Sequence, residues 1–295
     1  MLLHAAPAPA AVPLFGAHTD GAVYDGSVDR IDALQRRLER RVAIVHWYQN
    51  WSAKPGGDWV STLHPELVRA VTDSGRTPLL SWEPWDPAAG PDQPRYRLAR
   101  IAHGAYDAYI ERWARGLRNL RARVYLRPMH EMNGDWYPWS GAARGNDPAD
   151  YRAAWRHLHD VFERVGADNV RWVWCVNNTD TTGTRLERFY PGRRYVDVLA
   201  MDGYNWGATK PEWGGWQSFH DVFAAAYHRL RALGDQPIWI AEVGSAPEGG
   251  DKARWVRNMW ETAGRWDRLK AIVWFDLDKE RDWRAGPVAS AFHSR

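Results

Sequence analysis

Cysteine, lysine and long apolar runs are all scarce in this chain of 295 residues, and each scarcity excludes something. Cys175 is the single cysteine, so neither an intrachain disulfide nor a cysteine-based zinc site can form. No run of about 18 apolar residues is present, and we therefore expect no membrane insertion. The alanine- and proline-rich start has too short an apolar stretch for a complete signal peptide. We expect residues 1–13 to form a flexible lead-in.

Lysine is rare because arginine carries most of the positive charge. Only five of the 39 basic residues are lysines, and the net charge is +3 with a pI near 9.0. The arginines are spread along the chain, as at Arg36, Arg37 and Arg156, and do not form a basic tract with interleaved aromatics. The sequence therefore predicts no nucleic-acid partner.

The sequence also lacks several motifs that are typical of metal or cofactor binding. The pair His130-Glu131 invites a metal interpretation, but the zinc-peptidase pattern needs a second histidine where Gly134 stands. We find no calcium-loop spacing, phosphate-cradling glycine loop or strand-turn-helix nucleophile elbow. The sequence predicts neither a metal nor an organic cofactor.

Short apolar runs rich in β-branched and aromatic residues recur along the chain and predict strands. The eight expected strands are Leu14–His18, Val42–Trp47, Pro78–Trp82, Val124–Met129, Val170–Val176, Val196–Met201, Ile238–Glu242 and Ala271–Phe275. Between them, apolar residues recur at spacings of three and four, as at Ile31, Leu34 and Leu38, which is typical of amphipathic helices. One such helix has a start signal at Asp147-Pro148 and a stop at Gly166.

Eight strand-helix units in about 280 residues favour a closed barrel over an open doubly wound sheet. No linker, repeat or low-complexity segment divides the chain after its first dozen residues. We therefore predict one α/β domain, a single (β/α)8 TIM barrel over residues 14–295. In such a barrel the active site lies at the carboxyl ends of the strands.

Two glutamates stand at expected strand ends among polar and aromatic residues. Glu131 lies in Arg127-Pro-Met-His-Glu-Met-Asn-Gly, followed by Trp136-Tyr-Pro-Trp139, and Glu242 lies in Ile240-Ala-Glu-Val-Gly. Glycoside hydrolysis uses two carboxyl groups flanking the scissile bond, and strands four and seven are on roughly opposite sides of a barrel. We predict that burial beside indoles raises the pKa of Glu131, while Arg127 and Tyr204 keep Glu242 ionised.

Other acids at the same end compete for a role. Glu83 ends the third strand, where a catalytic or a substrate hydrogen-bonding role is open, and we favour the second. Asp202 is either a site residue or a brace for its loop, and Asp276 and Asp278 are expected to brace loops or face solvent.

Twenty tryptophans exceed what a barrel interior of branched aliphatic residues needs. An indole offers a flat face to the C–H bonds of a sugar and a donor to its hydroxyls. Six tryptophans in or beside strand-end loops are therefore predicted to bind sugar rings: Trp82, Trp85, Trp136, Trp139, Trp206 and Trp274. Those on helical stripes are predicted to pack against the barrel: Trp113, Trp155, Trp255 and Trp260.

The segments around the two glutamates resemble glycoside hydrolase family 26, the β-mannanases and related β-glycanases. Tyr190-Pro-Gly with Tyr195-Val-Asp-Val and Met201-Asp-Gly-Tyr-Asn extends the resemblance over most of the chain. It implies a (β/α)8 barrel and a retaining double displacement, with Glu131 as acid/base and Glu242 as nucleophile. It also implies that His130 orients Glu131, that Tyr204 contacts the nucleophile and that Trp274 floors the subsite of the cleaved sugar. Arg127 and Asn133 complete the substrate-binding set that we predict.

One departure from the family bears on the substrate. Mannan-cleaving members often carry a histidine in the loop after strand three, whereas Trp82-Glu-Pro-Trp85 looks closer to members that act on glucan. We predict an endo-acting β-glycanase, with β-1,4-mannan narrowly ahead of mixed-linkage β-glucan. An enzyme that processes an exopolysaccharide and an inactive polysaccharide-binding barrel remain alternatives. We expect a monomer that is secreted or otherwise extracytoplasmic and whose partner is its polysaccharide substrate.

Overall fold

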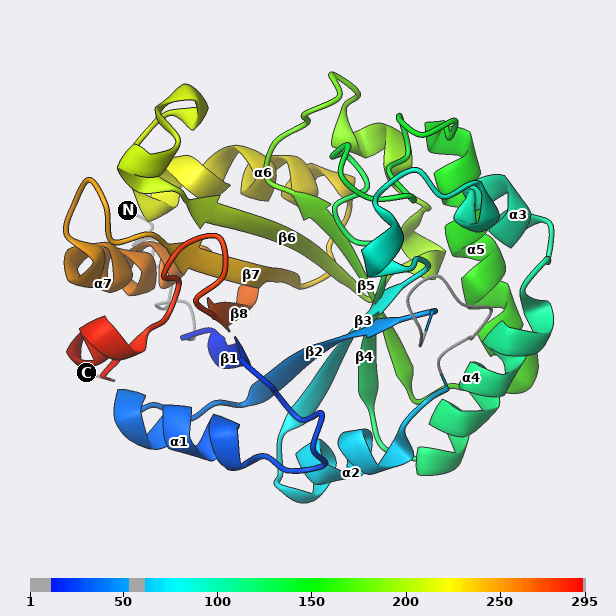
Figure 1. Ribbon diagram of the computed structural model, residues 1–295, viewed down its shortest axis with the longest axis horizontal. Helices are drawn as coiled ribbons and strands as arrows, with labels where there is room; N and C mark the ends of the chain where they lie inside the picture. Colours follow the sequence, from blue (N-terminus) through cyan, green and yellow to red (C-terminus); the bar gives the residue numbers. More distant parts are fainter. Residues whose placement is uncertain (1–11, 53–61, 294–295) are drawn as a thin grey trace, which may run out of the picture.

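The computed structural model of the chain describes residues 12–52 and 62–293, and these form a closed eight-stranded parallel barrel (Figure 1). Each strand pairs with its neighbours in sequence order, and β1 pairs with β8 to close the ring. The strands are β1 (Leu14–Thr19), β2 (Ile44–Asn50), β3 (Thr77–Glu83), β4 (Val124–Pro128), β5 (Val170–Asn177), β6 (Val198–Asn205), β7 (Ile238–Ser245) and β8 (Leu269–Asp276). The predicted (β/α)8 barrel and all eight of its strands are confirmed, with ends that differ by up to four residues.

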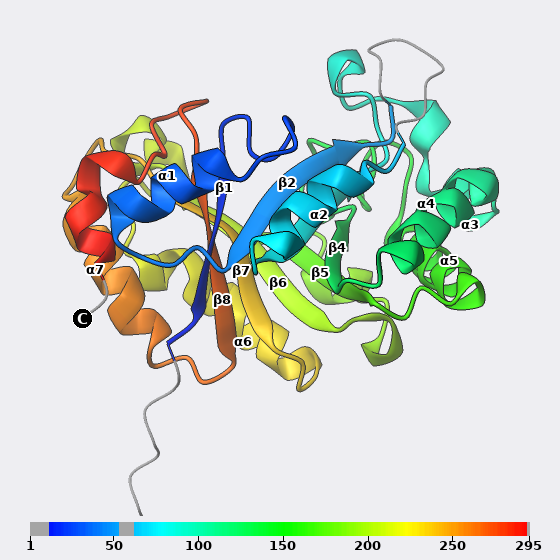
Figure 2. The ribbon, with the colours of Figure 1, turned by 90° about the horizontal axis from the view of Figure 1, so that it is seen from below.

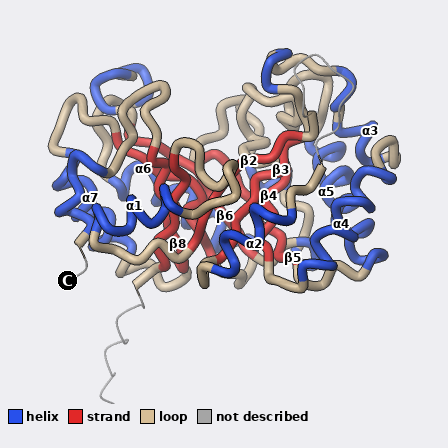
Figure 3. The backbone as a smooth tube through the Cα atoms, turned by 60° about the horizontal axis from the view of Figure 1, so that its bottom comes forward, coloured by secondary structure: helices blue, strands red, loops and turns tan. Residues whose placement is uncertain are grey.

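Helices surround the strands on the outside, as the tube view shows with helices in blue and strands in red (Figure 3). The α-helices are α1 (Asp29–Leu38), α2 (Pro65–Asp73), α3 (Leu98–Ala102), α4 (Asp107–Leu120), α5 (Pro148–Val165), α6 (Phe219–Leu233) and α7 (Lys252–Ala263). In Figure 2, α1 lies against β1. Helix α2 packs against β3. Short 3-10 segments, Leu186–Phe189 and Arg193–Tyr195, stand between β5 and β6 in place of an α-helix.

The start and stop signals of α5 work as the sequence predicts. The side chain of Asp147 accepts hydrogen bonds from the backbone amides of Ala149 and Asp150. The side chain of Asp150 in turn accepts a hydrogen bond from the backbone amide of Asp147, which completes a capping box. Gly166 ends the helix in the left-handed conformation, with φ of 75°. Local chemistry therefore sets the ends of this helix before any packing is considered.

Side chains of each strand alternate between the barrel interior and the helix-covered outside. Interior positions carry small or branched residues such as Leu79, Val173 and Ala200, which form a cluster separate from the outer core. The alternate positions, such as Leu80, Trp82 and Trp174, pack with the helices in the main hydrophobic cluster. A third cluster at the mouth joins Ala246, Phe275 and Trp283, with Tyr204 and Trp206 packed against it.

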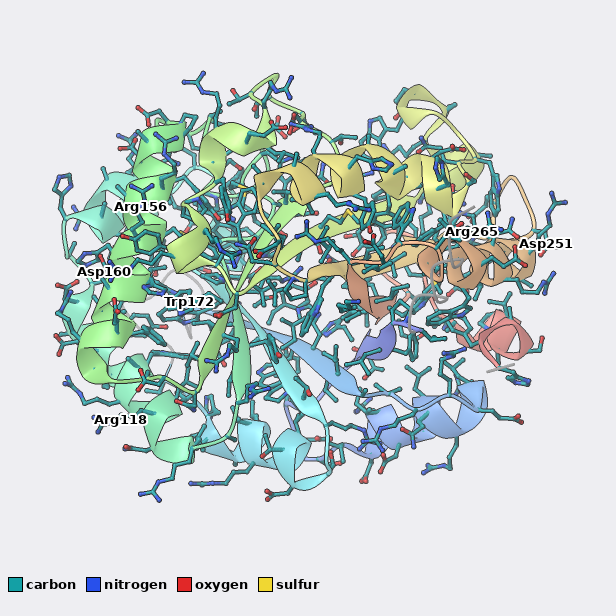
Figure 4. All side chains as sticks on the ribbon, turned by 180° about the vertical axis from the view of Figure 1, so that it is seen from behind. Arg118, Arg156, Asp160, Trp172, Asp251 and Arg265 are labelled. Atoms are coloured by element: carbon teal, nitrogen blue, oxygen red, sulfur yellow. The ribbon has the colours of Figure 1, made fainter. Side chains whose placement is uncertain are left out.

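Charged side chains cover the outer helices. Figure 4, seen from behind, places Arg118, Arg156 and Arg265 at separate points of the periphery, while Trp172 lies toward the middle. Among residues 12–52 and 62–293, no helix combines the length and apolarity needed to cross a membrane. The predicted lead-in falls almost wholly on residues 1–11, which lie outside the described residues.

Candidate active site

The site is built from inward-pointing positions at the carboxyl ends of the strands. Going around the barrel, these side chains are His18, Tyr48, Glu83, Arg127, Asp202, Tyr204, Glu242 and Phe275. Strand β4 ends shortly before Glu131, and β7 contains Glu242. Figure 1 shows these two strands on different sides of the ring. Polar groups thus line the same opening from nearly every strand.

Glu131 lies in a tightly held turn directly after β4. Met129 and Glu131 both have positive φ, 48° and 53°, which costs energy for residues that carry a Cβ. Hydrogen bonds hold this backbone in place: the Met129 amide donates to the Trp82 carbonyl at 3.2 Å and the Glu131 amide to the Cys175 carbonyl at 2.9 Å. These hydrogen bonds fix the backbone from which the Glu131 side chain projects at the rim of the barrel.

Burial controls the protonation of Glu131. The residue is only 9% exposed, and the indole Nε1 of Trp136 donates to its Oε2 at 2.9 Å. Burial raises the pKa of Glu131 to about 8, the charge of Glu242 adds to the rise, and the Trp136 hydrogen bond partly offsets it. The Glu131 carboxyl is therefore protonated at neutral pH.

A bulge in β7 turns Glu242 into the mouth. Ile240 pairs with Met201, but the next pair joins Glu242 to Asp202, so one extra residue is inserted on β7. Such an insertion reverses the face to which the following side chains point. Without the bulge, strand alternation would direct Glu242 toward the helices.

Three donors converge on the Glu242 carboxylate. Tyr48 Oη donates to Oε1 at 2.6 Å, Tyr204 Oη donates to Oε2 at 2.6 Å, and the guanidinium of Arg127 also donates to Oε1. Burial alone would raise the pKa of Glu242, but the Arg127 charge and these hydrogen bonds outweigh it and lower the pKa to about 2. Glu242 is thus ionised where Glu131 is protonated.

Arg127 joins two buried carboxyl groups. Its Nη1 donates to both oxygens of Asp202 at 2.9 and 2.8 Å, while its Nη2 reaches Glu242. Its Nε donates to Ser81 Oγ at 2.7 Å, and that hydroxyl lies 2.7 Å from His46 Nε2. Burial raises the pKa of Asp202 well above its ordinary value, although the charge of Arg127 acts to lower it.

His130 sits beside these groups as a neutral imidazole. Its Nε2 lies 3.2 Å from Tyr137 Oη and 4.0 Å from Glu83 Oε1, and burial holds its pKa well below the usual range. Burial likewise raises the pKa of Glu83 to about 7. The resemblance implied that His130 orients Glu131, but among the described residues the hydrogen bond to the Glu131 carboxyl comes from Trp136.

The same groups include three potential metal ligands. One ligand atom each of His130, Asp202 and Glu242 lie within 4.8 Å of one another. The guanidinium of Arg127 already donates to both carboxylates, so a positive charge occupies the position that a cation would take. Since a divalent ion would have to displace a fully buried arginine, these residues do not fit a metal site.

Three of the predicted sugar-binding tryptophans lie at the mouth with part of their surface open: Trp85, Trp136 and Trp206. The prediction is wrong for Trp82, Trp139 and Trp274, each of which is 0% exposed. Trp82 and Trp274 occupy outward positions of β3 and β8, so Trp82 packs against Tyr109 and Trp113, and Trp274 packs against Phe292. The indole of Trp139 is turned inward and donates to the His130 carbonyl at 2.6 Å.

Three polar residues predicted to bind substrate are also fully buried: Arg127, Asn133 and Asp202. The Asn133 amide donates to the carbonyls of Asn177 and Thr179 at 2.9 and 3.0 Å and so ties two loops together. Arg127 and Asp202 are engaged with each other. These three side chains therefore support the site and do not line it, because their hydrogen-bonding groups are already used by protein atoms.

Sequence reasoning missed Tyr48 as a partner of Glu242 and Tyr137 as a partner of His130. It also missed the buried pair His46 and Ser81 behind Arg127. Strand alternation carried a signal for three of them, because 46 and 48 on β2 and 81 and 83 on β3 share the inward face. Trp283 gave no comparable signal, since it follows β8 in a loop.

Comparison with known proteins places the chain among carbohydrate-active barrels. Residues 42–236 match the sequence profile of the family described as Glycosyl hydrolase family 26. Endoglucanase H of Acetivibrio thermocellus is 40% identical over 263 residues, which cover 88% of this chain and 27% of that protein. A mannan endo-1,4-beta-mannosidase of Thermothelomyces thermophilus is 29% identical over 242 residues, covering 75% of this chain and 42% of that protein. The chain thus spans less than half the length of these two relatives.

Solved structures show the same fold. The GH26 domain of a Prevotella bryantii endo-beta-mannanase/endo-beta-glucanase superposes with a TM-score of 0.67 at 16% identity, covering 96% of this chain and 89% of that one. A beta-mannanase from a symbiotic protist of the termite Reticulitermes speratus gives 0.66 at 18% identity, covering 98% and 93%. The family profile covers well over half of the sequence, and the resemblance first seen around the two glutamates is confirmed: this chain belongs to glycosyl hydrolase family 26.

Proposed function

We propose that this chain is a retaining endo-β-glycanase in which Glu131 is the general acid/base and Glu242 the nucleophile. The observation that carries the proposal is the different surroundings of two buried carboxyl groups at one barrel mouth: an indole donor at Glu131, and two tyrosines and an arginine at Glu242. With burial, these surroundings raise the pKa of Glu131 to about 8 and lower the pKa of Glu242 to about 2. Pairs of acids whose environments separate their pKa values divide the acid and base roles of a reaction between them. The charge of Glu242 contributes to the raised pKa of Glu131, so the two groups act on each other.

The first step forms a glycosyl-enzyme. A Glu242 carboxylate oxygen attacks the anomeric carbon, the bond to the leaving oxygen breaks, and the Glu131 proton goes to that oxygen. In the second step the Glu131 carboxylate takes a proton from water, whose oxygen attacks the anomeric carbon and releases Glu242. Neither step uses a metal or an organic cofactor.

The donors around Glu242 suit this route. Tyr48, Tyr204 and Arg127 hold the carboxylate ionised and fixed in position, which favours direct attack. An inverting enzyme instead leaves room for a water beside its base. We therefore expect the first product to keep the β configuration, which proton NMR of the fresh product measures directly; an initial α anomer would contradict the retaining route.

Two polymers are candidates for the substrate. β-1,4-Mannan, ranked first from the sequence, has the support of three relatives whose names include mannan endo-1,4-beta-mannosidase. They are 28–33% identical over alignments that cover 43–75% of this chain. A β-glucan has the support of endoglucanase H, which is 40% identical over 88% of the chain. The Trp82-Glu-Pro-Trp85 loop points the same way, and we assay β-glucan first for these two reasons.

The test is reducing-sugar release from mannan, lichenan, xylan and a bacterial exopolysaccharide, with wild type and Glu242→Ala side by side. We expect one polymer to be cleaved and the variant to lose activity by about 10⁴-fold or more while still binding that polymer. Residual activity within about tenfold of wild type would rule out Glu242 as nucleophile. Binding without sugar release by wild type would favour the inactive barrel instead.

We also propose that the barrel acts outside the cytoplasm, because a long polysaccharide does not cross a membrane unaided. We further propose that it acts as a monomer. Light scattering coupled to size exclusion measures the mass of the protein in solution. A stable dimer would contradict the proposed monomer.

A further inference from the structure

The loop between β6 and α6 presents an indole to solvent. Trp213 is 54% exposed and is among the few large hydrophobic residues left open in the described part of the chain. It ends the 3-10 segment Pro211–Trp213, in the yellow-green loop that projects beside α6 in Figure 1. A single exposed apolar side chain needs no explanation by itself, so its surroundings decide whether it means anything.

Trp213 is the outer end of a row of aromatic rings that begins at the nucleophile. Tyr204 donates to Glu242 Oε2, and its ring centroid lies 4.9 Å from that of Trp283. Trp283 lies 5.0 Å from Trp206, and Trp206 lies 5.0 Å from Trp213. Burial decreases outward along this row, from the nearly closed Trp283 through the half-buried Trp206 to the open Trp213.

Hydrogen bonds anchor the loop that carries Trp213 to the ends of β6 and β7. The buried Asn205 amide donates to Ser245 Oγ at 2.9 Å, and its Oδ1 accepts from the amides of Gly207 and Gln217 at 3.2 and 3.0 Å. The Ala208 amide donates to the Glu248 carbonyl at 3.0 Å, which ties the loop to the one after β7. Both ends of the loop are thus held to the catalytic strands.

Gly207 makes the close approach of the two loops possible. Its φ is +58°, and a Cβ built on it would lie 2.0 Å from the Glu248 carbonyl oxygen. A side chain at this position would push the loops apart. The indole of Trp213 is therefore presented from a defined backbone, as a binding platform requires.

Charged groups at the rim complete a sugar-binding composition. The Lys210 Nζ lies over one face of the Trp213 ring, 4.8 Å from its centroid, and Lys210 also pairs with Glu212 at 3.5 Å. A pyranose offers apolar C–H faces to an indole and hydroxyls to flanking charged groups. A purely apolar partner would leave these charges desolvated and unsatisfied.

We propose that Trp213, with Lys210 Nζ over one face of its ring, is an outer subsite that stacks on a distal pyranose ring of the polymer held at the catalytic carboxylates. The assignment rests on the proposed glycanase function. Because Trp206 and Trp283 stand between Trp213 and Tyr204, the subsite is reached by substrates that extend several sugars from the scissile bond. Short oligosaccharides do not reach it.

The experiment compares Trp213→Ala and Trp213→Phe with wild type on a series of oligosaccharides of increasing length and on the polymer. Leu14→Ala is the matched control, because Leu14 is 52% exposed but begins β1, at the opposite end of the barrel. We expect kcat/KM of Trp213→Ala to fall about tenfold on the polymer and on long oligosaccharides, mainly through KM, and to stay within about twofold on the shortest substrate cleaved. Trp213→Phe is expected to recover part of the loss, and Leu14→Ala to match wild type.

Direct binding of a long oligosaccharide to Glu242→Ala, with and without Trp213→Ala, separates this proposal from the proposed function. If wild type cleaves nothing but the tryptophan is needed for binding, the outer subsite stands and the hydrolase assignment fails. Equal kinetics of Trp213→Ala and wild type on all lengths would overturn the subsite, as would an equal loss on short and long substrates. A change in oligomeric state with unchanged kinetics would also overturn it, since the indole would then contact a second copy of the chain.

Discussion

Glu131 and Glu242 share one barrel mouth and are almost equally buried, at 9% and 6% exposed, yet their surroundings drive them to opposite charge states. Within the described part of the chain, the Glu131 carboxyl accepts a hydrogen bond from the Trp136 indole and is destabilised in its ionised form by the charge of Glu242. Glu242 receives hydrogen bonds from two tyrosines and an arginine. Burial is therefore not what distinguishes them; the number and charge of the donors is.

The two glutamates also differ in how the backbone positions them. Glu131 is aimed by a turn with two left-handed non-glycine residues, and Glu242 by a bulge that shifts the strand register by one. Both devices depart from regular strand geometry. Hydrogen bonds hold the turn, and pairing with β6 holds the bulge. Neighbouring strands therefore stabilise the irregular backbone that positions each acid.

The largest expected effect comes from removing the charge that separates the two acids. Arg127→Met leaves two buried carboxyls without their cation, and we expect the free energy of unfolding at pH 7 to fall by about 3–5 kcal/mol. The pKa of Glu242 should rise toward its ordinary value, so activity is lost at a higher pH as the solution is acidified. Urea denaturation and pH-rate profiles measure both effects.

Arg127→Lys is the control for Arg127→Met, in case the first variant does not fold. It keeps the charge but cannot span Ser81, Asp202 and Glu242 at once. We expect an intermediate loss. A stable Arg127→Met protein with an unmoved acidic limb would contradict the role of this arginine.

A smaller effect is expected for Tyr204→Phe, which deletes one donor to Glu242 and keeps the ring. A hydrogen bond to a charged group is worth about 1.5–3 kcal/mol, so kcat should fall roughly 10–100-fold. Because the hydrogen bond favours the ionised form, its removal raises the pKa of Glu242 and moves the acidic limb of the pH-rate profile upward. Tyr48→Phe removes the matching donor on Oε1 and should move that limb in the same direction; a shift in neither variant would refute the account.

The smallest effect concerns the other acid. Trp136→Phe removes the indole hydrogen bond that partly lowers the pKa of Glu131. That pKa should then rise further above about 8, so the basic limb of the profile moves to higher pH by about one unit or less, with the acidic limb unchanged. Movement of the basic limb downward would mean that burial by the indole, and not its hydrogen bond, is the dominant influence.

The sequence predicted the barrel well because the relevant signals are local. Apolar runs such as Val170–Val176 and the capping residues around α5 specify their elements without knowledge of the rest. The two glutamates could be singled out because both stand at strand ends beside distinctive residues. Trp82 and Trp274 stand near strand ends, but their positions in the strand alternation point them outward against the helices, so nearness to a strand end does not imply exposure.

Other features could not be predicted from local pattern. Tyr48 meets Glu242 across 194 residues of chain, and Trp283 meets Tyr204 only because the loop after β8 folds back over the mouth. The bulge that turns Glu242 inward is a matter of register between β6 and β7. None of these contacts has a short-range signature.

By itself, the sequence determined the eight strands and the ends of helices such as α5, because alternation, capping and turn chemistry act between residues close along the chain. The tertiary structure alone decided which acid is protonated, which tryptophans remain open to a sugar and which donors hold Glu242. Those outcomes depend on burial and on charges that meet only when the barrel closes.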